Sequence, residues 1–180
     1  RKSEVIKIIN RFEKINYNNI GIKFQPFKYD KIALENFSWY DTYKELFIQK
    51  KDWAEIILQS KNTFKNVWLD LFDIYSVEIL EQNINKIYGL KLQASVLENL
   101  EIFNSLLKIN INNKKLMINI SGYKIIDIEK IIFNLNQLNA NELIIQIGYQ
   151  SYPTKLEDSA LNKILLIKEK FPLTRLCFAD

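Results

Sequence analysis

The chain has 180 residues, of which 48% are hydrophobic, 26% charged and 13% aromatic, and this composition is typical of a folded globular protein and not of a disordered one. The net charge of +4 comes from scattered lysines without a basic block, so it predicts no nucleic-acid partner. The apolar runs are too short to span a membrane, the single cysteine excludes an internal disulfide, and the lack of histidine excludes Ser-His-Asp and Cys-His nucleophiles.

Apolar side chains alternate between helical and strand spacing along the whole chain. Helices are predicted over residues 2–15, 39–48, 52–61, 76–84, 99–108, 127–138 and 158–171. Strands are predicted over residues 20–27, 66–73, 87–93, 115–120, 142–147 and 174–179. This order predicts an α/β fold in which about six parallel strands are covered by helices. Periodicity alone fits an open doubly wound sheet and part of a barrel equally well.

Capping residues and apolar stripes define several of these helices. Ser76 is a plausible N-cap for the helix over 76–84, and Asn99 for the helix over 99–108. The spacing of the second helix predicts four buried side chains, which are Leu100, Phe103, Leu106 and Leu107.

Polar residues at the ends of the predicted strands are the candidates for function, because active sites of parallel β/α folds lie at the carboxyl ends of the strands. Lys23 and Lys91, on different strands, suit an anionic ligand such as a phosphate or carboxylate, and they are equally well explained as lysines at the rim of the fold. A lysine with a depressed pKa could also form a Schiff base. The strand ends further offer Gln25, Phe27, Asp70, Asp73, Gln93, Ser95, Asn119, Ser121, Tyr123, Gln150, Tyr152, Thr154 and Asp180.

Several of these segments, in this order, resemble the N-acetylneuraminate (sialic acid) synthase family. The matches are Lys23-Phe24-Gln25, Phe72-Asp73 at the end of the second strand, Lys91-Leu92-Gln93-Ala94-Ser95 with Asn99-Leu100 after it, Ser121-Gly122-Tyr123, Tyr152-Pro153-Thr154 with Glu157-Asp158 after it, and Ala179-Asp180. The resemblance implies a TIM-type β/α barrel. It also implies a carbon–carbon bond-forming transferase of sialic acid and carbohydrate biosynthesis, which condenses phosphoenolpyruvate with an N-acetylmannosamine-like amino sugar.

The residues that the resemblance assigns to a phosphoenolpyruvate-like substrate are Lys23, Gln25, Lys91, Ser95, Ser121, Gln150 and Tyr152. The family uses manganese or magnesium to polarise the sugar aldehyde. Here Ile147 stands where the family has a metal-binding histidine, and Ala94 and Val96 replace its serine and glutamate. We therefore assign no metal ligand and no catalytic residue in this chain. The alternative function is a non-catalytic or altered barrel that binds a small anion without metal.

The alignment also predicts the extent of the domain. We expect residues 1–180 to form one incomplete barrel domain, truncated at both ends, without the C-terminal antifreeze-like domain of the family. A cytoplasmic location is expected because one free cysteine suits a reducing compartment. The expected partners are the small-molecule substrates and no membrane, and a homodimer is a possible assembly.

Overall fold

The strands of the chain form one six-stranded sheet in the order β1-β2-β3-β4-β5-β6, so each strand lies beside the next one in sequence. β1 pairs with β2, β4 with β5 and β5 with β6, all in parallel. Sequential parallel strands separated by helices are typical of a β/α barrel, whereas a doubly wound sheet changes direction at a switch point. The predicted α/β fold of the partial barrel type is therefore confirmed.

The computed structural model describes residues 1–14, 19–149, 154, 155, 157, 159 and 161–179. The strands are β1 (Gly21–Phe24), β2 (Asn66–Leu71), β3 (Gly89–Leu92), β4 (Lys115–Asn119), β5 (Glu142–Gly148) and β6 (Arg175–Ala179). The helices are α1 (Lys2–Glu13), α2 (Tyr29–Ile32), α3 (Tyr40–Leu46), α4 (Lys50–Thr63), α5 (Ile74–Asn83), α6 (Leu100–Leu106), α7 (Ile125–Leu135) and α8 (Lys163–Lys170), with short 3₁₀ helices η1 (Ile84–Lys86), η2 (Ala94–Val96) and η3 (Asn136–Leu138). None of the helices in this part of the chain has the length and hydrophobicity that a membrane span requires.

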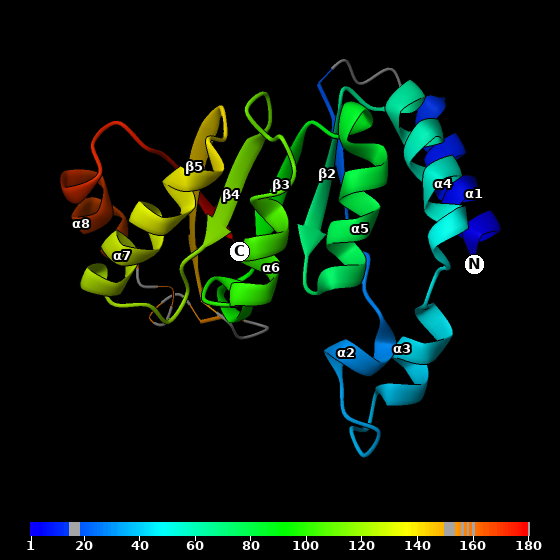
Figure 1. Cartoon of the computed structure of the whole chain (residues 1–180), viewed down its shortest axis with the longest axis horizontal. Helices are drawn as coiled ribbons and strands as arrows, with labels where there is room; N and C mark the ends of the chain where they lie inside the picture. Colours follow the sequence, from blue (N-terminus) through cyan, green and yellow to red (C-terminus); the bar gives the residue numbers. More distant parts are fainter. Residues whose placement is uncertain (15–18, 150–153, 156, 158, 160, 180) are drawn as a thin grey trace. The chain divides into compact units, whose positions relative to one another are not determined.

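The chain divides into two compact units, residues 1–90 and 91–180. In the first unit α4 and α5 pack on β2, and α1 lies along α4 (Figure 1). Helix α4 buries Trp53, Ile56 and Ile57, as its i, i+3, i+4 spacing predicts. Each buried side chain of this size contributes about 1.5–3 kcal/mol to folding. The expected single barrel domain over residues 1–180 stays a prediction.

In the second unit, the register of the strands separates an apolar face from a polar one. Asn119 of β4 is aligned with Gln146 of β5, which is aligned with Cys177 of β6. Residues on either side of this row point to the opposite face because strand side chains alternate. On that opposite face Ile118 and Ile145 are fully buried. The row of Asn119, Gln146 and Cys177 therefore marks the polar face of these strands near their carboxyl ends.

Three local predictions need correction. Helix α5 begins at Ile74 with Asp73 as its N-cap, and Ser76 is the third residue of the helix and not the cap. Asn99 caps α6 as predicted, but Leu100 is 73% exposed, because the buried stripe consists of Ile102 and Leu106 at i, i+4 spacing. Leu107 is also exposed. Helix α8 begins at Lys163, later than predicted, and residues 158 and 160 lie outside the described part of the chain.

Candidate functional site

In the first unit, the carboxyl ends of β1 and β2 hold an ion pair. The Lys23 ammonium lies 2.6 Å from Oδ2 of Asp70, whose side chain is completely buried. The Gln25 amide donates a longer hydrogen bond of 3.4 Å to the same oxygen. The structure thus brings together two of the predicted site residues, Lys23 and Gln25, on a carboxylate. The positive charge of Lys23 is matched by a negative one, which reduces its attraction for an anionic ligand.

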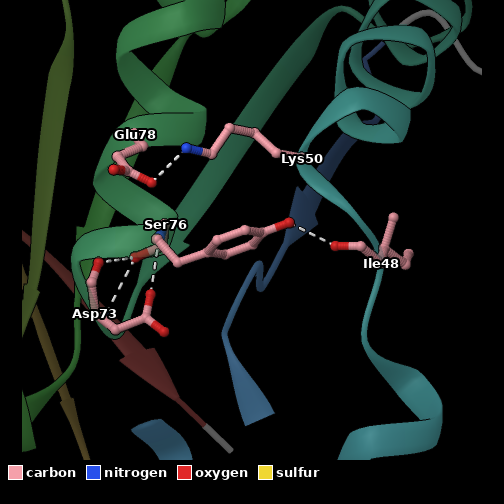
Figure 2. A network of polar contacts seen from close by, with 6 residues as sticks. Ile48, Lys50, Asp73, Ser76 and Glu78 are labelled. Atoms are coloured by element: carbon pink, nitrogen blue, oxygen red, sulfur yellow. Dashed lines mark hydrogen bonds and ion pairs between the residues drawn. The ribbon is translucent and has the colours of Figure 1, made fainter. Parts of the chain in front are cut away.

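Asp73, at the end of β2, has a structural role. Its Oδ1 accepts the backbone N–H of Ser76 at 2.8 Å, and the Ser76 hydroxyl accepts the backbone N–H of Asp73, so the two residues form a capping box at the start of α5 (Figure 2). Oδ2 of Asp73 accepts the backbone N–H of Lys28 at 2.7 Å. Both carboxylate oxygens of Asp73 therefore accept backbone N–H groups, and the residue joins the segment after β1 to the start of α5.

The same helix contacts the first residue of α4 and the segment that precedes it. Figure 2 shows the ion pair between Lys50 and Glu78, whose atoms lie 2.6 Å apart. The Tyr75 hydroxyl donates to the carbonyl of Ile48 at 2.5 Å. Burial raises the pKa of the Tyr75 hydroxyl to about 12, so this donor keeps its proton at all physiological pH values.

In the second unit, a lysine and a set of neutral polar groups meet at the carboxyl ends of the strands. Lys91, at the end of β3, is only 5% exposed. The Gln93 side chain accepts a hydrogen bond from the Asn119 amide at 3.3 Å, and Oδ1 of Asn119 accepts the backbone N–H of Ser121 at 2.9 Å. The Ser121 hydroxyl donates to the carbonyl of Gly148 at 2.7 Å. This network connects the ends of β3, β4 and β5 and fixes Ser121 beside them.

Gln146, and not Ile147, is the residue of β5 on the polar face. Ile147 is 2% exposed and points to the same side as the buried Ile145. Oε1 of Gln146 is buried and has no hydrogen-bond partner among the described residues. A buried polar atom without a partner is rare in folded proteins, and at the edge of a site it indicates a place where a ligand or water donates a hydrogen bond.

Tyr123 and Lys163 extend this region towards α8. The Tyr123 hydroxyl donates to the carbonyl of Ala94 at 3.0 Å and to Glu98 at 3.2 Å, while the Lys163 ammonium donates to the carbonyl of Tyr123 at 2.7 Å. Burial, followed by the nearby Glu98 carboxylate, raises the pKa of the Tyr123 hydroxyl. Burial lowers the pKa of the Lys163 ammonium. The roles of Lys163 and Gln146 were not predicted from the sequence.

The remaining predicted residues divide into two groups. Ser95 lies in η2 and is exposed, and Val96 beside it is buried in the core, so the sequence position of the family glutamate holds a packing residue. Gln150 and Tyr152 lie outside the described residues. The assignment of the seven residues to a phosphoenolpyruvate-like substrate stays a prediction.

The described residues do not fit the divalent metal that the sequence resemblance implies. No group of three or more His, Cys, Asp or Glu side chains in the described part of the chain could hold a metal ion. Near the polar row, Gln146 offers one free amide oxygen, whereas manganese and magnesium prefer several carboxylate oxygens. Burial raises the pKa of the Cys177 thiol, and the charge of Lys91 only partly offsets this shift. This shift disfavours the thiolate, which is the form of cysteine that binds metals.

Comparison with known proteins gives similarity at the level of the fold. No family model and no curated protein matches the chain. Among solved structures, it is similar to an N-acetylneuraminic acid (sialic acid) synthetase from Leptospira borgpetersenii, crystallised in complex with citrate, with a TM-score of 0.81 and 17% identity over 99% of this chain and 60% of that one. The fold resembles that of a sialic acid synthetase. The resemblance predicted from the sequence is thus confirmed in the structure.

Two further structures carry the same fold. A protein described as spore coat polysaccharide biosynthesis protein E from Chromobacterium violaceum has a TM-score of 0.82 and 16% identity over 99% of this chain and 54% of that one. The spore coat polysaccharide biosynthesis protein spsE from Bacillus subtilis has a TM-score of 0.74 and 15% identity over 100% of this chain and 49% of that one. The chain thus spans about half to three-fifths of the length of these proteins.

Proposed function

We propose that this chain binds phosphoenolpyruvate, or a closely similar small anion, at the carboxyl ends of the strands in residues 91–180. The observation that carries the proposal is Lys91, a lysine that is 5% exposed at the end of β3. Ligands of parallel β/α folds bind at the carboxyl ends of the strands, and a positive charge there suits an anionic ligand. The citrate bound by the Leptospira protein, a small polycarboxylate, is a ligand of the same charge class.

The neutral groups around Lys91 suit the recognition of such an anion. Ser121 can reorient its hydroxyl from the Gly148 carbonyl towards a ligand, and Gln146 has a carboxamide at the same face. Hydrogen bonds from neutral donors to an ionised acceptor are stronger than those between two neutral groups. The roles that the sequence predicts for Lys23 and Gln25, in the first unit, stay predictions, and there Asp70 reduces the charge of Lys23.

The test is titration calorimetry with phosphoenolpyruvate in buffer without divalent metal. We expect Lys91→Gln to weaken binding by about tenfold or more, which corresponds to about 1.4 kcal/mol. The control is Lys108→Gln, which removes an exposed lysine of the same unit and should leave the affinity unchanged. Circular dichroism would show whether both proteins are folded. If they are, equal affinities of the wild-type chain and Lys91→Gln would refute the proposal.

A synthase activity of the whole protein is the second part of the proposal. Condensation of phosphoenolpyruvate with an N-acetylmannosamine-like sugar would release phosphate and yield a nonulosonic acid. The unsuitable metal donors among the described residues favour the alternative, in which this part of the protein binds the anion without catalysing the condensation. Manganese-dependent formation of a 2-keto acid from the two substrates distinguishes them: product supports the synthase, and binding without product supports the alternative.

A further inference from the structure

Lys163 lies at the same edge of the second unit as the proposed anion site. It is the first residue of α8, and its ammonium donates to the carbonyl of Tyr123 at 2.7 Å. Tyr123 follows Ser121 by two residues, and the Ser121 hydroxyl contacts Gly148 at the end of β5. The ammonium of Lys163 is thus joined through one loop to the carboxyl ends of β4 and β5.

The environment of Lys163 differs from that of the other lysines on its helix. Lys168 is exposed and donates to the carbonyl of Pro172, and Lys170 forms a 2.8 Å ion pair with Glu129. Lys163 is half-buried, and no carboxylate among the described residues forms an ion pair with it. A lysine ammonium has three N–H donors, and the Tyr123 carbonyl occupies one of them.

A carboxylate beside this loop, Glu98, contacts Tyr123 and not Lys163. Glu98 accepts a hydrogen bond from the hydroxyl of Tyr123 at 3.2 Å, and that hydroxyl also lies 3.0 Å from the Ala94 carbonyl. Partial removal of a cation from water costs free energy unless an opposite charge offsets the loss. Burial lowers the pKa of Lys163, which agrees with a cation that has no anionic partner among the described residues.

We propose that Lys163 is a further binding residue of the anion site, whose ammonium contacts the phosphate or carboxylate group of the ligand that Lys91 attracts. This inference rests on the proposed function. A second cation matches the multiple negative charges of phosphoenolpyruvate, and its bond to the Tyr123 carbonyl holds the ammonium in place before the ligand binds. The sequence resemblance assigned no role to this position.

The test compares phosphoenolpyruvate affinities of the wild-type chain, Lys163→Gln, Lys163→Arg and Lys168→Gln by calorimetry at low and high salt. Glutamine removes the charge and keeps an N–H donor for the Tyr123 carbonyl on a side chain that is one bond shorter. We expect Lys163→Gln to weaken binding about tenfold at low salt, Lys163→Arg to recover most of the loss, and Lys168→Gln to bind like the wild type. The affinity of Lys163→Gln should also depend less steeply on salt, which a purely structural role would not produce.

Each other outcome is decisive. If Lys163→Gln binds within twofold of the wild type, or if Lys168→Gln loses as much affinity, the inference is wrong while the proposed function stands. If Lys163→Gln loses affinity without any change in salt dependence, Lys163 acts by positioning the Tyr123 loop and the direct contact is refuted. If the wild-type chain does not bind phosphoenolpyruvate, the proposed function and this inference fall together.

Discussion

At the scale of single residues, the three lysines near the strand ends have different electrostatic roles. Lys23 is paired with the buried Asp70, Lys91 is almost completely buried, and Lys163 is half-buried against a neutral carbonyl. Because the charge of Lys23 is compensated, its main effect is expected on stability. Lys91 and Lys163 are expected to affect ligand affinity more than Lys23 does.

Lys23→Met tests the structural role of the first lysine. The change removes the ammonium 2.6 Å from the Asp70 carboxylate, and a buried charge that loses an opposite charge is destabilised. Since Lys23 itself is partly exposed, we expect the free energy of unfolding to fall by about 1–3 kcal/mol in urea denaturation. Lys28→Met, which breaks the exposed pair with Asp30, should change it by less than about 0.5 kcal/mol. Similar losses in both variants would contradict this role.

Gln146→Leu tests whether the buried amide of Gln146 lowers the stability of the free chain. Leucine removes a buried oxygen without a partner, so we expect the free chain to gain about 1 kcal/mol in unfolding free energy. Asn119→Leu in the same row is the matched control, because both ends of the Asn119 amide are hydrogen-bonded and its loss should destabilise. The idea fails if thermal unfolding shows both variants shifted in the same direction.

The pH dependence of binding provides a separate test of Lys163. Burial places the pKa of this ammonium below the ordinary value of 10.5, and the cation exists only below that pKa. The contribution of Lys163 to anion affinity should therefore be complete near neutral pH and disappear as the pH rises through the lowered pKa. Calorimetry across this alkaline range should show the decline in the wild type, and Lys163→Arg should lack this component because arginine stays charged. An identical decline in Lys163→Arg would assign the effect to another group.

At the scale of elements, Asp73 joins two segments of the first unit. It caps α5 and also accepts the backbone N–H of Lys28, so Asp73→Ala removes two kinds of backbone contact. We expect a loss of about 2–3 kcal/mol, from about 1–2 for the cap and about 1 for the second bond. Asn99→Ala, which removes a cap of α6 without a second segment, should cost about 1 kcal/mol in the same urea titration. Equal costs would show that the Lys28 contact contributes nothing.

The helices also show where periodicity succeeds and where it does not. The buried residues Trp53, Ile56 and Ile57 of α4 follow helical spacing because all three lie inside a long helix. Leu100 and Leu107 are assigned wrongly because they lie at or beyond the ends of the short helix α6, where the helical spacing no longer determines which face a residue joins.

At the scale of the whole molecule, the alternation of strands and helices predicts the order of the sheet, and the motif resemblance selects the barrel type. Neither predicts that Lys23 pairs with Asp70, 47 residues away, or that Lys163 reaches the carbonyl of Tyr123, 40 residues away. Such contacts depend on strand register and on loop geometry, which composition and spacing do not determine. The same holds for the polar face of β5. A shift of one residue in the register of this strand decides whether Ile147 or Gln146 lies on that face.

The location of the proposed site within the molecule can be measured by amide hydrogen exchange. A ligand that binds only the folded chain stabilises it by about 2.7 kcal/mol at a concentration of about a hundred times its dissociation constant. We expect phosphoenolpyruvate to slow exchange most in peptides that cover residues 89–97, 119–124 and 163–170, which contain Lys91, Ser121 and Lys163. Peptides from α1 and α4 carry none of the proposed contacts and serve as the internal control. Protection confined to those two helices would place the ligand elsewhere, whereas protection of the three segments that Lys91→Gln abolishes would support the proposed site.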